Sequence, residues 1–305
     1  MASFRVSLDV NCDKLDLNTI IEKTCEECPS ISVKMTPIDG SVNMFEVTLS
    51  SSSESVTSKS DAIFRNLLPA NVLTSRYSPN SRQSVDTLMK YCSDNDYVRH
   101  SFDLINKSLD DYKPEEICVA FNGGKDCTAL LHLVYTIFIT KYPNNLLNVF
   151  FISIPDIFPL LDNFVQQSVE RYNLNLISYS ESNFKLALKK LNTETKIRSI
   201  FMGTRISDVP KHVMIKECQM TDPDWPQFLR ICPLLDWSYG QIWCFLRDNR
   251  VPYCSLYDCG YTSIGSTNNT TPNPLLKFIS HSGCTYYWPA FMLTNEDQER
   301  NGRTH

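Results

Sequence analysis

Hydrophobic and polar positions follow two rhythms in the middle of the chain, one typical of buried strands and one typical of helices. Short apolar runs rich in β-branched residues predict strands near 117–121, 149–153, 174–179 and 199–203. Between them, apolar residues recur at helical spacing and predict helices near 127–141, 158–172 and 183–192. Strands without a polar face need cover on both sides. The alternation therefore predicts an α/β fold with a parallel sheet covered by helices on both faces.

The first 75 residues follow a different pattern, which predicts a small, separate α+β unit. Strand-like runs occur near 4–10, 31–35 and 44–49, the last two joined through Asp39-Gly40, and helical spacing occurs near 17–25 and 61–68. The serine-rich stretch 50–60 predicts a flexible connection. Residues 76–84 predict a linker, and a single helical segment, 84–110, leads into a main domain that we expect to span 85–305.

Composition and charge narrow the function classes. The formal net charge of -5 argues against a nucleic-acid surface, which needs a basic excess. No apolar run reaches the roughly 18 residues of a membrane span, and the N-terminus resembles neither a signal nor a transit peptide. The twelve cysteines are scattered, so they predict reduced core thiols rather than a disulfide framework. We expect a cytoplasmic protein without nucleic-acid or membrane partners.

A strand-to-helix junction carries the strongest chemical signal. The strand near 117–121 ends in Asn122-Gly123-Gly124-Lys125-Asp126, and helical spacing begins directly afterwards. Glycines let backbone N–H groups approach a ligand closely, and a helix N-terminus directs its unpaired donors at an anion. Lys125 adds a positive charge, while Asp126 suits orienting the loop or holding Mg²⁺. The junction predicts a phosphate-binding loop, although its short spacing is not that of a P-loop.

A second polar segment follows another predicted strand. Gly203-Thr204-Arg205-Ile206-Ser207-Asp208 follows the apolar run Ile200-Phe201-Met202, so it should open at the same sheet edge as the first loop. Arg205 suits a phosphate, and Asp208 suits a ring N–H or a partner cation. The alternative is a surface turn with a local ion pair.

Two later segments carry candidate site residues. Ser238 and Gln241 form a predicted capping box, which places Asp236 and Trp237 just before a helix N-terminus. Trp237 suits either the core or a stacking platform. Near the end of the chain, Arg300 and Arg303 would share one face of a helix and could clamp a polyphosphate. Ordinary solvated charge is the alternative for this pair.

Taken together, these motifs resemble the animal-type FAD synthases, which are FMN adenylyltransferases in the PAPS reductase-like branch of the N-type ATP pyrophosphatases. The matching segments, which fall within 85–305, are Phe121-Asn122-Gly123-Gly124-Lys125-Asp126-Cys127, Gly203-Thr204-Arg205 with Asp208, Pro233-Leu234-Leu235-Asp236-Trp237, Val251-Pro252-Tyr253-Cys254, Leu256-Tyr257-Asp258, Gly260-Tyr261-Thr262-Ser263 and Glu299-Arg300-Asn301-Gly302-Arg303. Residues 1–75 resemble the tail of the molybdopterin-binding-like domain that precedes the synthase in longer family members.

The resemblance implies a reaction in which ATP and FMN give FAD and pyrophosphate. It also implies Mg²⁺ and transient contact with apo-flavoproteins that receive the product. It assigns four residues to catalysis: Lys125, Arg300, Arg303 and Asp208. The implied binding residues are Asn122, Gly123, Gly124, Lys125, Asp126, Gly203, Arg205, Asp208, Asp236 and Trp237, and the implied Mg²⁺ ligands are Asp126 and Asp156.

The chain departs from the family at one motif, and two other enzyme classes share its loop. The family often has Gly-Thr-Arg-Arg-Thr-Asp-Pro, whereas here the second Arg is Ile206 and the Pro stands at 210. A PAPS reductase needs a nucleophilic Cys near its C-terminus, but no Cys follows Cys284. A tRNA-thiolating enzyme needs paired reactive cysteines and a basic surface. A nucleotide-binding module without activity would be expected to have a damaged loop.

Overall fold

The computed structural model describes residues 4–11, 14–38, 44–68, 82–180, 183–210 and 212–304. By their contacts these residues form two compact units. Unit 1 combines 1–76 with 252–305, and unit 2 comprises 77–251. None of the described helices has the length and apolar character needed to cross a membrane.

Unit 2 is built on a six-stranded sheet, which confirms the predicted α/β fold. Its strands, in the order β6-β5-β4-β7-β9-β8, are Asn175–Tyr179, Asn148–Ile152, Ile117–Ala120, Ser199–Phe201, Leu229–Ile231 and Cys218–Met220. All neighbouring pairs are parallel except β8 with β9, so the sheet has one antiparallel edge strand. The short β8 and β9 were not predicted from the sequence.

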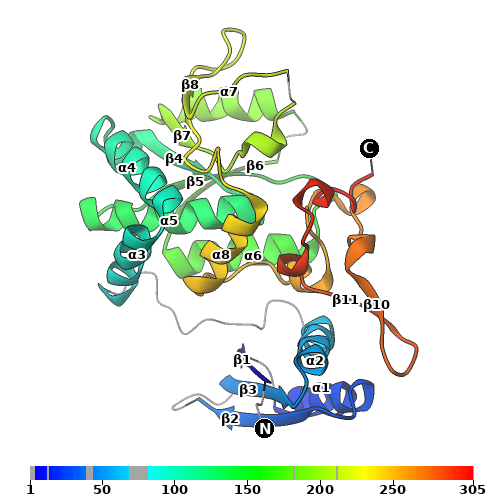
Figure 1. The fold of residues 1–305 in the computed structure, drawn as a ribbon. Coiled ribbons are helices and arrows are strands. Elements are labelled where there is room, and N and C mark those ends of the chain that lie inside the picture. Colours follow the sequence, from blue (N-terminus) through cyan, green and yellow to red (C-terminus); the bar gives the residue numbers. More distant parts are fainter. Residues whose placement is uncertain are drawn as a thin grey trace. The chain divides into compact units, whose positions relative to one another are not determined.

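Helices cover both faces of this sheet. The predicted helices are present as α5 (Lys125–Lys141), α6 (Pro159–Tyr172) and α7 (Phe184–Glu194). Figure 1 shows α7 on one side of the sheet and α5, α6 and α8 (Tyr239–Asp248) on the other. On the α7 side, Leu188 and Leu191 belong to one buried cluster with Cys118, Phe150 and Ile200 of the strands.

The predicted approach helix is in fact two helices. They are α3 (Arg82–Asp94) and α4 (Asp96–Asp110), separated at Asn95, whose backbone is extended. The Asn95 side chain donates to Tyr91 O at 2.9 Å, and the Asn95 carbonyl accepts from Val98 N and Arg99 N. This local bonding ends one helix and starts the next.

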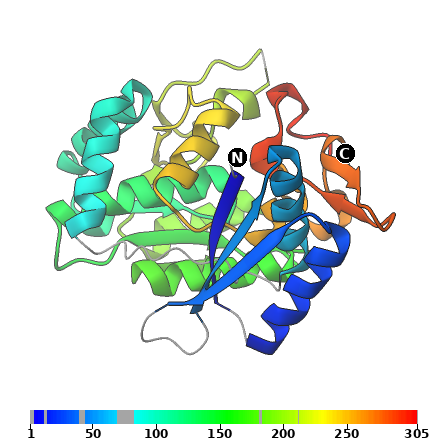
Figure 2. The same cartoon turned by 60° about the horizontal axis from the view of Figure 1, so that its bottom comes forward.

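The N-terminal part of unit 1 has the predicted β-α-β-β-α order. An antiparallel sheet, β1-β3-β2, consists of Phe4–Asn11, Met44–Ser51 and Ser32–Pro37. The helices α1 (Lys14–Glu27) and α2 (Glu54–Leu67) lie beside this sheet (Figure 2). Leu17 of α1 and Phe64 of α2 join the strands in one buried cluster. The predicted Asp39-Gly40 connection and residues 76–81 of the predicted linker lie outside the described residues.

The expectation of a flexible serine-rich stretch at 50–60 is wrong. Helix α2 already begins at Glu54. The hydroxyls of Thr57 and Ser60 donate to carbonyl oxygens one turn back, at 3.1 and 2.9 Å. Both side chains are buried. Burial is possible because each hydroxyl donor is already paired with a carbonyl oxygen of the helix.

The C-terminal part of unit 1, 252–305, contains little regular structure. It consists of short 3-10 turns, among them Ser255–Cys259, and a two-stranded hairpin, β10 (Lys277–Ile279) with β11 (Thr285–Tyr287). The predicted helix carrying Arg300 and Arg303 is absent from this segment. A turn is present instead, in which Arg303 N donates to Arg300 O at 2.8 Å and Arg303 bridges to Thr270. Gly302 lies against Thr271 O, so this backbone follows a neighbouring loop closely.

Candidate active site

The strand order of unit 2 creates a crevice at the carboxyl ends of β4 and β7. From β4 the chain moves outward to β5 and β6, and it returns on the other side of β4 as β7. Connections that leave in opposite directions open a gap at such a switch point, which is where ligands bind in open α/β sheets. The two loops predicted to share one edge follow these two strands, and that prediction is confirmed.

The loop after β4 is shaped by its own side chains. Asn122 Oδ1 accepts from Gly124 N at 3.0 Å and from the Cys127 thiol at 2.9 Å. Gly123 has φ +77°, and a β-carbon there would lie 2.8 Å from a methyl group of Leu161. Gly124 is the N-cap of α5 and has no side-chain acceptor, so it leaves the first-turn N–H groups for an anion.

Lys125 and Asp126 link this loop to the loop after β7. Asp126 Oδ2 lies 3.1 Å from Lys125 Nζ, and Asp126 Oδ1 lies 2.8 Å from Arg205 Nε. The Lys125 and Arg205 side chains are only 3% and 2% exposed, so one carboxylate holds two buried cations at the crevice. Lys125 Nζ also lies 5.2 Å from the centre of the Tyr239 ring. The cluster carries excess positive charge, which suits a polyphosphate.

Close backbone packing fixes the two loops against each other. A β-carbon on Gly203 would lie 2.8 Å from the backbone nitrogen of Cys127. Only glycine therefore allows the chain leaving β7 to pass so close to the first turn of α5. Asp208 Oδ2 accepts from Arg205 N at 3.0 Å, which orders the turn that follows.

The loop after β9 joins the same edge. Ile206 N donates to Leu235 O at 2.7 Å, and the predicted capping box is present, with Ser238 Oγ accepting from Gln241 N at 3.1 Å. Asp236 is exposed here. Trp237 is buried among core side chains, and its indole N–H donates to Ser101 Oγ at 2.9 Å. A role for Trp237 in a nucleotide pocket stays a prediction.

The cysteine in the loop is not suited to nucleophilic chemistry. Burial raises the pKa of the Cys127 thiol to about 12, so it stays protonated near neutral pH. Its S–H serves as a donor within the loop instead. Cys127 therefore supports the shape of the loop and does not supply a reactive thiol.

The predicted magnesium ligands are not arranged around a metal position. Both oxygens of Asp126 face cations, and Asp156 is exposed in the turn after β5. The described ranges contain no group of three or more His, Cys, Asp or Glu side chains that could hold a metal ion. These side chains as arranged do not form a Mg²⁺ site by themselves. That Asp126 and Asp156 contribute to Mg²⁺ binding stays a prediction.

A cavity of about 180 Å³ lies on the α7 side of the same sheet. Its walls come from strand residues, from α7 and from the connection between β8 and β9, and comprise Ala120, Phe150, Phe184, Leu188, Ile200, Met202, Thr221, Asp222, Trp225 and Arg230. The centroids of the Phe184 and Trp225 rings lie 6.2 Å apart. Arg230 Nε is buried, and no described residue accepts from it. A mostly apolar cavity with aromatic walls and one unsatisfied donor is suited to a planar, heteroatom-bearing ring.

This cavity was not predicted from the sequence. Asp222, Trp225 and Arg230 flank the β8–β9 turn, where short strands give no periodic signal. The available clue was the Asp222-Pro223-Asp224-Trp225-Pro226 run, because a large aromatic side chain in a polar, proline-bounded turn lies outside any periodic core segment. The expected charge stabilisers Arg300 and Arg303 lie in unit 1. Burial, and after it the charge of Arg300, lower the pKa of Arg303.

Comparison with known proteins identifies relatives of this chain. Residues 116–272 match the family model of the phosphoadenosine phosphosulfate reductase domain. The chain is 38% identical over 211 residues to the probable FAD synthase of Schizosaccharomyces pombe, covering 67% of this chain and 78% of the relative. It is also 38% identical over 205 residues to the probable FAD synthase of Caenorhabditis elegans, covering 66% of this chain. It spans only 39% of that relative's length.

A solved structure has the same fold. Candida glabrata FMN adenylyltransferase, in complex with FMN and the ATP analogue AMPCPP, superposes with a TM-score of 0.65 at 25% sequence identity. The match covers 72% of this chain and 99% of that one.

Proposed function

This chain belongs to the PAPS reductase domain family and, within it, to the FAD synthases, and we propose that it transfers the adenylyl group of ATP to FMN. The products are FAD and pyrophosphate. One observation carries the proposal most: a glycine-rich anion-binding loop and an aromatic cavity lie on the same sheet of unit 2. The first suits the phosphates of ATP, and the second suits the ring of a flavin.

The proposed chemistry forms one bond and breaks one. A phosphate oxygen of FMN attacks the α-phosphorus of ATP, and the bond from that phosphorus to the bridging oxygen of the β-phosphate breaks. The electron pair leaves with pyrophosphate. A phosphate monoester is largely dianionic near neutral pH, so its oxygen needs no general base. Catalysis then rests on positioning and on stabilising charge.

We assign the donor side to the loop after β4. Backbone N–H groups at Gly123, Gly124 and the first turn of α5 would hold the phosphates, with Asn122 fixing the loop. Lys125 would exchange part of its contact with Asp126 for a phosphate oxygen, and Arg205 would hold Asp126 in place. Arg300 and Arg303 are assigned, from the family resemblance, to the charge that develops on the leaving oxygens.

We assign the acceptor side to the cavity beneath α7. The Trp225 and Phe184 rings would bound the flavin ring, and Arg230 Nε would donate to one of its carbonyl oxygens or ring nitrogens. Asp208 and Gly203 would shape the path between cavity and loop. Asp236 and Trp237 stay assigned to the nucleotide side. Hand-over of FAD to apo-flavoproteins stays a prediction.

The test is turnover of the purified chain with ATP, magnesium chloride and FMN. We expect FAD and pyrophosphate in equal amounts. Lys125→Ala should lower kcat by about 10²–10³-fold, the usual loss for one transition-state donor. Lys141→Ala, at the far end of the same helix, serves as the matched control. A Lys125→Ala variant with wild-type turnover would rule out the assigned role, and absence of FAD from the wild type would rule out the function.

A further inference from the structure

The C-terminal segment of unit 1, residues 252–305, shares a small buried core with the N-terminal part of the same unit. Cys28, Ile63 and Tyr286 form one buried cluster, with Phe278 packed against it. The regular elements of 252–305 are short 3-10 turns and a hairpin whose strands have three residues each. Helix α2 therefore contributes, through Ile63, to the packing that holds the hairpin of 252–305.

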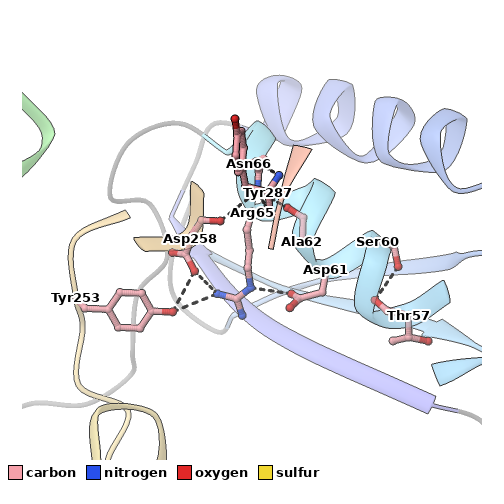
Figure 3. Close-up of polar contacts among 9 residues, drawn as sticks. All are labelled: Thr57, Ser60, Asp61, Ala62, Arg65, Asn66, Tyr253, Asp258 and Tyr287. Atoms are coloured by element: carbon pink, nitrogen blue, oxygen red, sulfur yellow. Dashed lines mark hydrogen bonds and ion pairs between the residues drawn. The ribbon is translucent and has the colours of Figure 1, made fainter. Parts of the chain in front are cut away.

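Arg65 of α2 forms a buried charge link to this segment (Figure 3). Its Nη1 lies 2.8 Å from Asp258 Oδ1, and its Nε lies 2.9 Å from Asp61 Oδ1 within the helix. Tyr253 OH donates to the same Asp258 oxygen at 3.0 Å. The Arg65 and Asp258 side chains are 10% and 3% exposed, and the Arg65 guanidinium also lies over the Phe291 ring. Burial raises the pKa of Asp258, and the Arg65 guanidinium opposes that rise.

Asn66 forms a second, uncharged link beside the first. Its Nδ2 donates to Asp258 O at 3.1 Å and to Tyr287 O at 2.9 Å, while its Oδ1 accepts from Tyr287 N at 3.1 Å. One amide side chain thus pairs with the backbone of both the 255–259 turn and strand β11 (Figure 3).

Hydrogen bonds continue from this turn to the arginine-bearing end of the chain. Asn273 N donates to Gly260 O at 2.8 Å, and Asn273 Nδ2 donates to Gln298 O at 2.8 Å. Thr262 Oγ1 donates to Glu299 O at 2.6 Å. Thr271 N donates to Gly302 O at 2.8 Å. Every link in this path is a backbone group or a buried polar side chain, so the path can transmit a displacement.

We propose that Arg65 and Asn66 are positioning residues for the turn that carries Arg300 and Arg303. The N-terminal part of unit 1 then serves as a brace that sets the positions of the Arg300 and Arg303 side chains for turnover. This inference rests on the proposed function for its kinetic readout. A displacement of about 1 Å at a charge-stabilising group can lower turnover by about 10²-fold.

The test uses full-length Arg65→Met and Asn66→Ala, with Asp61→Asn as the matched control. Asp61 contacts Arg65 only within α2, so its substitution leaves the link to Asp258 intact. Steady-state kinetics are measured well below the unfolding midpoint of every variant. We expect kcat to fall by roughly 10- to 100-fold in Arg65→Met and less in Asn66→Ala. KM for FMN should stay within about twofold, and Asp61→Asn should resemble the wild type.

Hydrogen exchange provides a readout that does not depend on activity. The amides of Thr271 and Arg303 should exchange faster in Arg65→Met and Asn66→Ala, but not in Asp61→Asn. Wild-type exchange in the folded Asn66→Ala variant would overturn the inference even if Arg65→Met fails to fold. A kcat loss that only follows the unfolded fraction would overturn it as well. If the wild type makes no FAD, the proposed function fails, and exchange alone decides whether the brace exists.

Discussion

At the scale of single residues, one carboxylate organises the candidate site. Asp126 forms ion pairs with both Lys125 and Arg205. Its negative charge offsets the repulsion between these two cations at the crevice. A polyphosphate entering the crevice would compete with Asp126 for Lys125. Buried ion pairs of this kind lose stability when one partner is removed, because a desolvated charge is left behind. The ion pair with Asp126 thus holds the Lys125 side chain at the crevice before a substrate binds.

The aromatic cavity leads to a prediction about substrate affinity. If Trp225 bounds the flavin ring, Trp225→Ala should raise KM for FMN by roughly tenfold or more, the usual effect of losing an aromatic stacking partner. KM for ATP should change little. Asp224→Ala is the control, because this exposed neighbour pairs with Lys185 and does not line the cavity. Equal shifts in both KM values would contradict the assignment of the cavity to FMN.

At the scale of elements, long periodic segments could be predicted and short ones could not. The four apolar strands and the helices α5, α6 and α7 each contain enough turns or buried positions for a clear period. Strands β8 and β9 have three residues each, too few for any pattern. Helix α2 was partly missed because its serines look like a linker unless their burial is known. The turn at Arg300 depends on Gly302 packing against another loop, which spacing alone cannot reveal.

The same limits explain what could be predicted of the site. The loop after β4 was evident because glycine, lysine and a strand-to-helix change occur within ten residues. The cavity was not, since it is assembled from five elements whose side chains meet only in three dimensions.

The contact between the loops after β4 and β7 leads to a prediction at this scale. Gly203→Ala would place a β-carbon against the backbone of Cys127, and backbone cannot swing aside as a side chain does. We expect a loss of about 1–3 kcal/mol in the free energy of unfolding and a displaced first turn of α5 that lowers kcat. Gly283→Ala meets no atom within 4 Å and carries only positive-φ strain, so it should keep wild-type kcat. Wild-type kcat for Gly203→Ala would contradict this account of the loop contact.

At the scale of the whole molecule, the start and the end of the chain belong to one compact unit. The predicted division into 1–75, a linker and an 85–305 synthase domain stays a prediction, as does the cytoplasmic location. The resemblance of 1–75 to part of a molybdopterin-binding-like domain also stays one. Helices α1 and α2 contact the C-terminal segment 252–305, through Glu27 with Ser282 and through Arg65 with Asp258.

A pH prediction follows from one of these contacts. Glu27, at the end of α1, accepts from Ser282 Oγ at 2.5 Å and from Tyr286 OH at 3.3 Å. The Ser282 hydroxyl is the main cause that lowers the pKa of Glu27. A carboxylate whose folded-state pKa is lowered stabilises the fold above its unfolded pKa of about 4.3, and this is lost as the pH falls through the folded value.

Denaturant unfolding of the wild type and Glu27→Gln at neutral pH and near pH 4 would measure this contribution. We expect the difference in free energy of unfolding to be full at neutral pH and to shrink on acidification below the unfolded pKa. Glu26→Gln, the exposed neighbour, should show little difference at either pH. A Glu27 difference that grows on acidification would contradict the assignment.

Adenylyl transfer to FMN can be followed with a label on the group that is transferred. The purified chain is incubated with FMN, magnesium chloride and ATP labelled at the α-phosphate, and the products are separated. We expect the label to enter FAD, with one pyrophosphate released for each FAD formed. Label recovered only in ATP, or released as AMP without FAD, would contradict it.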